Sequence, residues 1–227
     1  MKTIVFASLA SMFMLAAAVA PLPKPFDLTV AGQPCNGKEE ERKSAQMIAA
    51  LDIHEGSVVA EMGAGSGGRT IDVAKHVGAA GRVFSTELGD DRLRNLRNAV
   101  EKAGAKNVTV TAAHATQTNL AEGCCDALYM ENVYHHFEDP TAMNASIFRT
   151  VKAGGRVAVM DFPPNGDEAK DPKDRDEEKH HGVKAATVQA ELERAGFELV
   201  KVEKVGTQGF IVVVKKPGTT SAQGSSE

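Results

Sequence analysis

The chain has 227 residues and a formal net charge of −4 at pH 7, with 42% hydrophobic and 25% charged residues. This length fits one domain with appendages, and the composition is that of an ordinary globular protein. Proteins that bind DNA or RNA usually present a basic face, so the acidic balance argues against a nucleic-acid partner. Three cysteines cannot form a disulfide framework, and no spacing of cysteine and histidine indicates a metal site.

The first twenty residues differ from the rest of the chain. Lys2 supplies a positive start, residues 3–20 carry no charge, and the stretch ends in a run of small residues. This pattern predicts an export signal peptide that is cleaved after Ala18 or Ala20. An uncleaved membrane anchor and a buried helix are the alternatives. We therefore expect an exported protein, periplasmic or secreted, or one that touches a membrane only through this segment.

The middle of the chain alternates strands and helices. Four prolines mark 21–36 as an extended linker, and the domain is expected over 37–216 with a disordered tail at 217–227. An amphipathic helix is expected at 39–52, before the first strand. The expected strands are 58–62, 82–87, 107–111, 126–130 and 155–161, and the helices between them are 70–77, 90–103 and 142–151. This order predicts a parallel sheet with helices on both faces.

The last part of the chain breaks this alternation. Residues 163–181 are polar and carry both signs of charge, which favours a solvated surface segment, with a lid as the second interpretation. A helix is expected near 183–195. The strands expected at 198–205 and 209–215 are separated by three residues, so they are close enough to form a hairpin.

A glycine-rich loop lies between the first strand and its helix, in Glu61-Met62-Gly63-Ala64-Gly65-Ser66-Gly67-Gly68. Glycines allow a sharp turn and a close approach to a ligand, and the helix that follows directs free N–H groups at it. The same glycines also fit the G-x-G-x-x-G pattern of dinucleotide-binding folds. The loop alone therefore leaves the ligand open.

Two acids narrow the choice of ligand. Glu61 stands two residues before Gly63, where a carboxylate would repel a pyrophosphate but attract the ammonium and sulfonium groups of S-adenosylmethionine (SAM). Glu87 ends the next strand, where a carboxylate can accept both hydroxyls of a ribose. Because Glu87 suits either cofactor, Glu61 is the residue that favours SAM.

The stretch 39–216 resembles the class I SAM-dependent methyltransferases. The resemblance rests on the glycine loop, the strand ending at Glu87, the segment 126–137 and the turn at 151–157, where Ala153 replaces the usual proline. Exported or uncharacterised bacterial members look most similar, because they share the Tyr134-His135-His136 segment. The resemblance implies an α/β fold, namely a Rossmann-like methyltransferase sandwich with a mostly parallel seven-stranded sheet and a C-terminal antiparallel hairpin.

The resemblance also implies a function, the transfer of a methyl group from SAM to an unidentified small-molecule acceptor. A NAD-dependent oxidoreductase and a non-catalytic SAM- or nucleoside-binding module are the alternatives. Many relatives carry an acid that binds adenine after the third strand, whereas this chain has His114 there. The residues expected to bind the cofactor are Glu61, Gly63, Ala64, Gly65, Gly67, Glu87, Leu88, His114, Ala115 and Glu131.

Methyl transfer from a sulfonium needs mainly alignment and the exclusion of water. A hydroxyl or ammonium acceptor must also lose a proton, so a base is then expected. The candidates for catalysis are Tyr134, His135, His136 and His181. The alternative for His135 and His136 is a structural imidazole, and the alternative for His181 is a place in a solvated loop. No metal is expected among them.

Overall fold

The structure is a computed structural model, and it describes residues 37–218. The expected signal segment 1–20 and linker 21–36 lie outside the described residues, as does most of the expected tail. Among the described residues, no helix is both long and apolar enough to cross a membrane.

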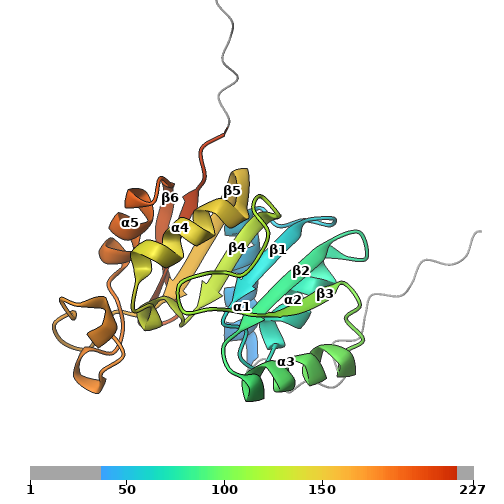
Figure 1. The fold of residues 1–227 in the computed structure, drawn as a ribbon, viewed down its shortest axis with the longest axis horizontal. Helices are drawn as coiled ribbons and strands as arrows, with labels where there is room; N and C mark the ends of the chain where they lie inside the picture. The colour runs from blue at the N-terminus through green and yellow to red at the C-terminus, as the bar shows by residue number, and fades with distance from the viewer. Residues whose placement is uncertain (1–36, 219–227) are drawn as a thin grey trace, which may run out of the picture. The chain divides into compact units, whose positions relative to one another are not determined.

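The alternation of strands and helices is present, with three short 3₁₀ helices added (Figure 1). The strands are β1 Val58–Met62, β2 Arg82–Glu87, β3 Val108–Ala112, β4 Cys125–Glu131, β5 Val151–Asp161, β6 Glu198–Val205 and β7 Gly209–Lys215. The helices are α1 Gly37–Leu51, α2 Gly68–Val77, α3 Asp90–Lys102, α4 Pro140–Thr150 and α5 Ala185–Arg194. The 3₁₀ helices are η1 Tyr134–His136, η2 Pro172–Asp174 and η3 Glu178–His180.

The strands form one sheet of seven in the order β3-β2-β1-β4-β5-β7-β6. The first five strands are parallel, and β7 runs antiparallel to both β5 and β6. The expected fold class is therefore confirmed. Because β1 to β5 all point the same way, the loops that follow them meet at one edge of the sheet, where ligands bind in open α/β folds.

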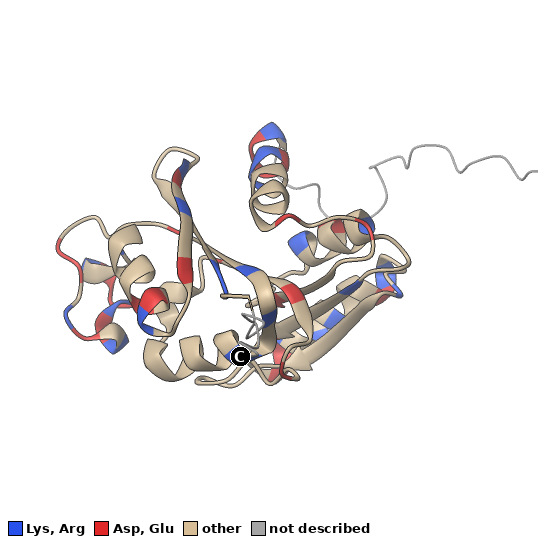
Figure 2. Cartoon of the chain, turned by 90° about the horizontal axis from the view of Figure 1, so that it is seen from above, with Lys and Arg blue, Asp and Glu red and all other residues tan. Residues whose placement is uncertain are grey.

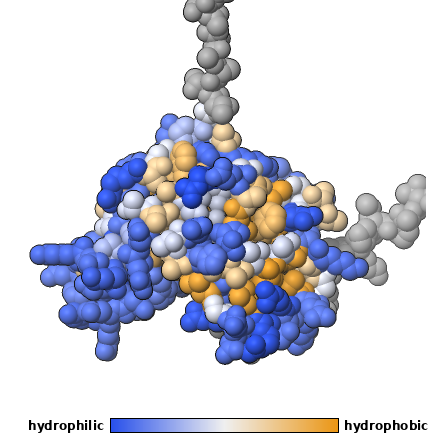
Figure 3. All heavy atoms as spheres, viewed as in Figure 1, coloured by the Kyte–Doolittle hydropathy of each residue, from blue (hydrophilic) through white to orange (hydrophobic). Residues whose placement is uncertain are grey.

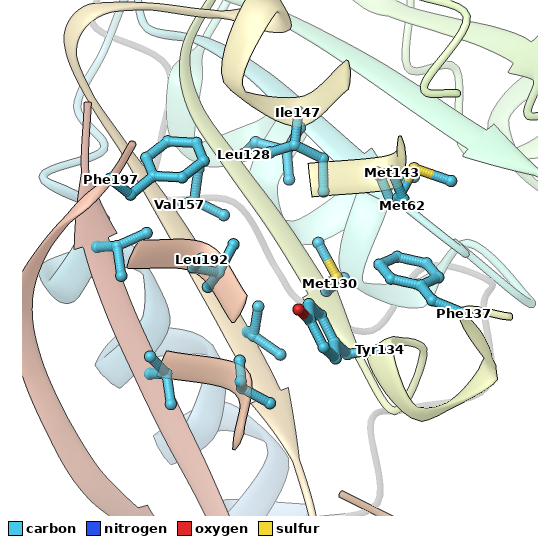
Figure 4. Packing of buried hydrophobic residues seen from close by; sticks show 14 of the residues in the cluster. Met62, Leu128, Met130, Tyr134, Phe137, Met143, Ile147, Val157, Leu192 and Phe197 are labelled. Atoms are coloured by element: carbon cyan, nitrogen blue, oxygen red, sulfur yellow. The ribbon is translucent and has the colours of Figure 1, made fainter. Parts of the chain in front are cut away.

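Each face of the sheet has its own core. Met47 of α1 and Val73 of α2 belong to the cluster on one face, and Ile147 of α4 and Leu192 of α5 belong to the cluster on the other. Figure 1 shows α4 and α5 in front of the sheet with α1 and α2 behind it, and Figure 4 shows the second cluster from close by. Strands covered on both faces have few surface positions, which explains their continuous apolar runs.

Several element boundaries differ from the prediction by one or two residues, and the start of β5 differs by more. The helix expected at 142–151 begins at Pro140, because Asp139 caps it by accepting a hydrogen bond from the N–H of Ala142 and proline suits the first helical position. The following strand begins at Val151 rather than at residue 155, and it pairs there with Cys125 of β4.

Residues 163–181, hereafter the charged segment, project from the fold at the lower left of Figure 1. Figures 2 and 3 show that this projection is hydrophilic and carries charges of both signs, as expected of a solvated surface. Arg175, however, is only 3% exposed and pairs with Glu191 of α5, with N–O distances of 2.6 and 3.2 Å. Glu168 also accepts hydrogen bonds from the Lys184 N–H and the Thr187 hydroxyl at the start of α5. The segment is thus anchored to α5 by side chains within it.

Candidate active site

The glycine loop joins β1 to α2 and passes over the end of β2. Gly63, Gly65 and Gly67 all have positive φ angles, of 70°, 54° and 81°. A Cβ on Gly63 would collide with Val133, whereas a Cβ on Gly65 would meet no atom within 4 Å. The N–H groups of Gly63 and Ala64 both donate to the carbonyl oxygen of residue 86, at 2.9 and 3.1 Å. The loop is therefore fixed from below and leaves open space beside Gly65.

Glu87 lies directly against this loop. Its Oε2 accepts the N–H of Gly65 at 2.6 Å, and its Oε1 accepts the N–H of Leu88 at 2.8 Å. Each carboxylate oxygen keeps a further lone pair for a hydroxyl group. The neighbouring Leu88 is 48% exposed, although it is large and apolar. The end of β2 thus combines a fixed acceptor with an uncovered apolar side chain.

Glu61 is buried, although its charge was expected to face a ligand. It is 4% exposed and accepts hydrogen bonds from the hydroxyls of Thr70 and Ser85 beneath the loop. Burial raises the pKa of its carboxyl to about 7, although these hydroxyls favour the charged form. The side chain lies beneath the loop because both faces of β1 are covered, and a direct contact of Glu61 with a ligand stays a prediction. The residue ties the loop to α2 and β2.

Glu131, at the end of β4, pairs with Arg69 from the first turn of α2. The two N–O distances are 2.5 and 3.1 Å. Arg69 also bonds Glu40 of α1 at 3.1 Å and the hydroxyl of Ser44. Arg69 is not among the residues predicted from the sequence, where its only distinguishing feature is a positive charge directly after the glycine loop. Arg69 holds α1 against the edge of the sheet where the expected cofactor residues meet.

His114 and Ala115 follow β3 and are exposed. They lie in a small turn closed by reciprocal backbone hydrogen bonds between His114 and Gln117, at 3.1 and 3.4 Å. The N–H of Ala113 donates to the carbonyl oxygen of Glu87 at 3.0 Å, so this turn is adjacent to the end of β2. The place expected for adenine recognition therefore lies beside Glu87, and the role of His114 stays a prediction.

His135 is a buried imidazole fixed by a carboxylate. It is 2% exposed, and its Nδ1 lies 2.9 Å from Oδ1 of Asp161, the last residue of β5. Asp161 also accepts the backbone N–H groups of Phe162 at 2.8 Å and of His135 at 3.2 Å. His181, from the end of the charged segment, places its Nε2 at 3.1 Å from Nε2 of His135. Two of the histidines expected to be catalytic thus meet in space.

His136 is oriented differently from its neighbour. Its side chain is 48% exposed, and its Nδ1 lies 3.0 Å from Oδ1 of Asp176. Partial burial, followed by the nearby His135, lowers the pKa of His136 below its usual value. A lowered pKa leaves this imidazole neutral near pH 7 and therefore able to accept a proton.

Tyr134 was expected among the catalytic residues, but its side chain lies in the core, and its catalytic role stays a prediction. The side chain is fully buried, and its hydroxyl donates to Glu191 at 2.9 Å and accepts from Asn144 at 2.7 Å. Figure 4 shows the ring beside Met130 inside the apolar cluster. Burial and the negative Glu191 raise the pKa of Tyr134. The 3₁₀ turn of η1 sends adjacent side chains in different directions, which the sequence pattern did not reveal.

A cleft of about 530 Å³ lies beside these residues. It is bounded by the start of α1, the ends of β4 and β5, and the β6–β7 turn. Asn132 on its wall has a φ of +54°, an uncommon backbone conformation for a residue other than glycine. Phe162, also on the wall, packs against His135 and His181 with ring centroids 4.9 and 5.1 Å apart. The cleft and the histidines therefore adjoin.

Known proteins match this arrangement. A sequence model of the "Methyltransferase domain" family matches residues 60–159. The ubiquinone/menaquinone biosynthesis C-methyltransferase UbiE of Klebsiella pneumoniae (strain ATCC 700721 / MGH 78578) is 26% identical over 111 residues, which are 48% of this chain and 44% of the relative. The chain thus spans less than half the length of this relative.

Solved structures agree on the fold. A SAM-dependent methyltransferase from Aquifex aeolicus has a TM-score of 0.66 at 22% identity, covering 76% of this chain and 88% of its own. Phosphoethanolamine N-methyltransferase 2 of Haemonchus contortus, in complex with SAM, has a TM-score of 0.65 at 14% identity, covering 78% and 52%. The match over residues 60–159 identifies this part of the chain as a methyltransferase domain, and the strand order and the solved structures show that the fold is Rossmann-like.

Proposed function

We propose that this protein binds SAM and transfers its methyl group to a small-molecule acceptor. The observation that carries the proposal is the geometry at the end of β2, where Glu87 is fixed by the Gly65 N–H beside open space. In this assignment Glu87 receives the ribose hydroxyls and the exposed Leu88 lies against the adenine. The loop then passes close to the rest of the cofactor.

The topology supports SAM over a nicotinamide cofactor. Dinucleotide-binding Rossmann folds have the parallel strand order 3-2-1-4-5-6. This sheet instead inserts the antiparallel β7 between β5 and β6. Since Glu61 is buried, the preference for SAM rests on this topology and on the family match rather than on a direct charge contact.

We assign the acceptor to the cleft beside Asn132 and Phe162. Its walls carry Glu39, Arg42 and Lys43 of α1, so charges of both signs face the space. Such a lining favours a polar acceptor. If the acceptor atom is a hydroxyl or ammonium, His136 is the proposed base, because it is half-exposed and its pKa is lowered.

Calorimetric titration with SAM, S-adenosylhomocysteine and NAD tests the cofactor assignment. We expect saturable binding of SAM and S-adenosylhomocysteine, and no binding of NAD. Binding of NAD alone would overturn the proposal and favour the oxidoreductase alternative.

Transfer is tested with SAM labelled on its methyl group and a metabolite extract. The wild type should label a small molecule, and His136→Ala should lower the rate while leaving SAM affinity unchanged. Equal rates of labelling by the wild type and His136→Ala would indicate that His136 has a structural role. Binding of SAM without labelling of any metabolite would favour a non-catalytic binding module.

The location of the protein is a separate proposal. The uncharged stretch 3–20 and its small-residue end support export or membrane anchoring. N-terminal sequencing of the mature protein tests this proposal, since a start at residue 19 or 21 indicates cleavage and an intact Met1 indicates none.

A further inference from the structure

We infer that His135, His181 and Asp176 form a binding site for a divalent cation of the zinc type. Each offers one ligand atom, and these atoms all lie within 4.8 Å of one another. The three residues come from η1 and from the charged segment, so a bound ion would join that segment to the sheet edge. This inference is independent of the proposed methyl transfer.

The distances suit one ion. Two nitrogens bound at about 2.0–2.1 Å to one tetrahedral ion lie about 3.3–3.4 Å apart. Nε2 of His135 and Nε2 of His181 are 3.1 Å apart, and Oδ1 of Asp176 is 3.7 Å from Nε2 of His181. Only small adjustments of exposed side chains separate this arrangement from coordination, since both His181 and Asp176 are on the surface.

Asp161 prepares His135 as a ligand. The carboxylate accepts hydrogen bonds only, so a proton on Nδ1 of His135 donates to it and Nε2 is left with a free lone pair. A carboxylate behind the second ring nitrogen is the usual support of a metal-bound histidine, because it fixes both the tautomer and the ring orientation. Asp161 is 2% exposed and accepts two backbone N–H groups as well, so it is itself firmly placed.

The donor set indicates the kind of ion. Two imidazoles and one carboxylate suit zinc and similar first-row ions better than calcium or magnesium, which prefer oxygen ligands. Three protein ligands leave a fourth position for water or for an atom of a small molecule. The site adjoins the cleft through Phe162, which contacts both histidine rings.

A direct hydrogen bond between the two imidazoles is the competing explanation of the 3.1 Å distance. In that case His181 would donate from Nε2 to the lone pair of His135, and Asp176 would serve only His136, whose Nδ1 is 3.0 Å away. The same Oδ1 of Asp176 lies nearest to both His136 and His181, and a carboxylate oxygen has two lone pairs, so Asp176 can bond His136 and an ion at the same time. Metal titration separates the two explanations.

The experiment titrates Zn²⁺ into the full-length, tag-free protein after treatment with a chelator. We expect one ion per chain, with affinity lowered at least tenfold in His181→Ala and in Asp176→Asn, both of which change exposed side chains. The matched control is His180→Ala, because His180 is the adjacent histidine but bonds the Asp167 carbonyl oxygen instead, at 2.7 Å. Its affinity should equal that of the wild type.

A second measurement tests Asp161, the buried carboxylate behind His135. Asp161→Asn should lower the affinity about 10- to 100-fold, as loss of the group behind a metal-bound histidine does. Hydrogen exchange adds a readout in the wild type, where Zn²⁺ should slow amide exchange over residues 172–182. The inference is overturned if Zn²⁺ does not bind, or if it binds equally well to His181→Ala, Asp176→Asn and the wild type. SAM titrations of the same samples report separately on the proposed function.

Discussion

The two halves of the carboxyl edge are built in different ways. The half at β1 and β2, with the glycine loop and Glu87, uses residues 61–88, which are close together in sequence. The half at β4 and β5 brings together His135, Asp161, Asp176 and His181, which come from three separate segments. Local sequence therefore specifies the first half, whereas the second depends on how the charged segment is anchored.

The largest expected effect tests that anchor. Arg175→Ala leaves the buried Glu191 without its principal partner, and breaking a buried ion pair costs about 3–5 kcal/mol of unfolding free energy. Urea unfolding at pH 7 measures this loss. The surface variant Arg94→Ala breaks the pair with Asp91 and should cost only about 0–1 kcal/mol. Similar costs for the two variants would show that the second half does not depend on Arg175.

The buried Glu61 gives the glycine-loop half a pH dependence. Its pKa is about 7 when folded, against 4.5 for the ordinary group, so the folded state holds a proton that the unfolded state has lost. The contribution of Glu61 to stability is thus fully present below pH 4.5 and is lost as pH rises through 7, by about 3 kcal/mol in total.

Glu61→Gln should remove this dependence. The variant and the wild type should unfold at similar urea concentrations near pH 5, and the variant should be the more stable at pH 8. Parallel pH profiles for the two proteins would contradict the raised pKa.

The next effect concerns the ligand rather than stability. Glu87→Ala removes a charged acceptor assigned to the ribose, so SAM affinity should fall about tenfold to a hundredfold, or about 1.5–3 kcal/mol. Calorimetry measures the change, with Glu101→Ala on the exposed side of α3 as the control. Unchanged affinity in a folded Glu87→Ala protein would remove Glu87 from the cofactor site.

The smallest expected effect on stability concerns the contact between the two halves, which Gly63 and Val133 make. Gly63→Ala should destabilise the protein by about 1–3 kcal/mol more than Gly104→Ala does. Both glycines have positive φ, of 70° and 63°, but only a Cβ on Gly63 would strike Val133. Urea unfolding compares the two variants, and adding Val133→Ala should restore part of the loss. An equal cost at both positions would show that backbone strain alone matters.

The sequence predicted the elements well where apolar runs and glycines mark them. The bounds expected for β1, β2, β6 and β7 are those of the structure. It did not predict the burial of Glu61 and Tyr134, because a residue type in a motif does not tell which way its side chain points. Glu61 is buried because both faces of the sheet are covered. The side chain of Tyr134 is buried because the 3₁₀ turn directs it into the apolar cluster.

By itself, the sequence determined the alternation of strands and helices, the glycine loop and the acid at the end of β2. These features follow from local periodicity, from the φ angles that glycine allows and from short chain separations. Only the tertiary structure decided that His135 meets Asp161 and His181, and that Arg175 is buried against Glu191. Such pairings depend on the packing of segments far apart in the chain, which no local pattern encodes.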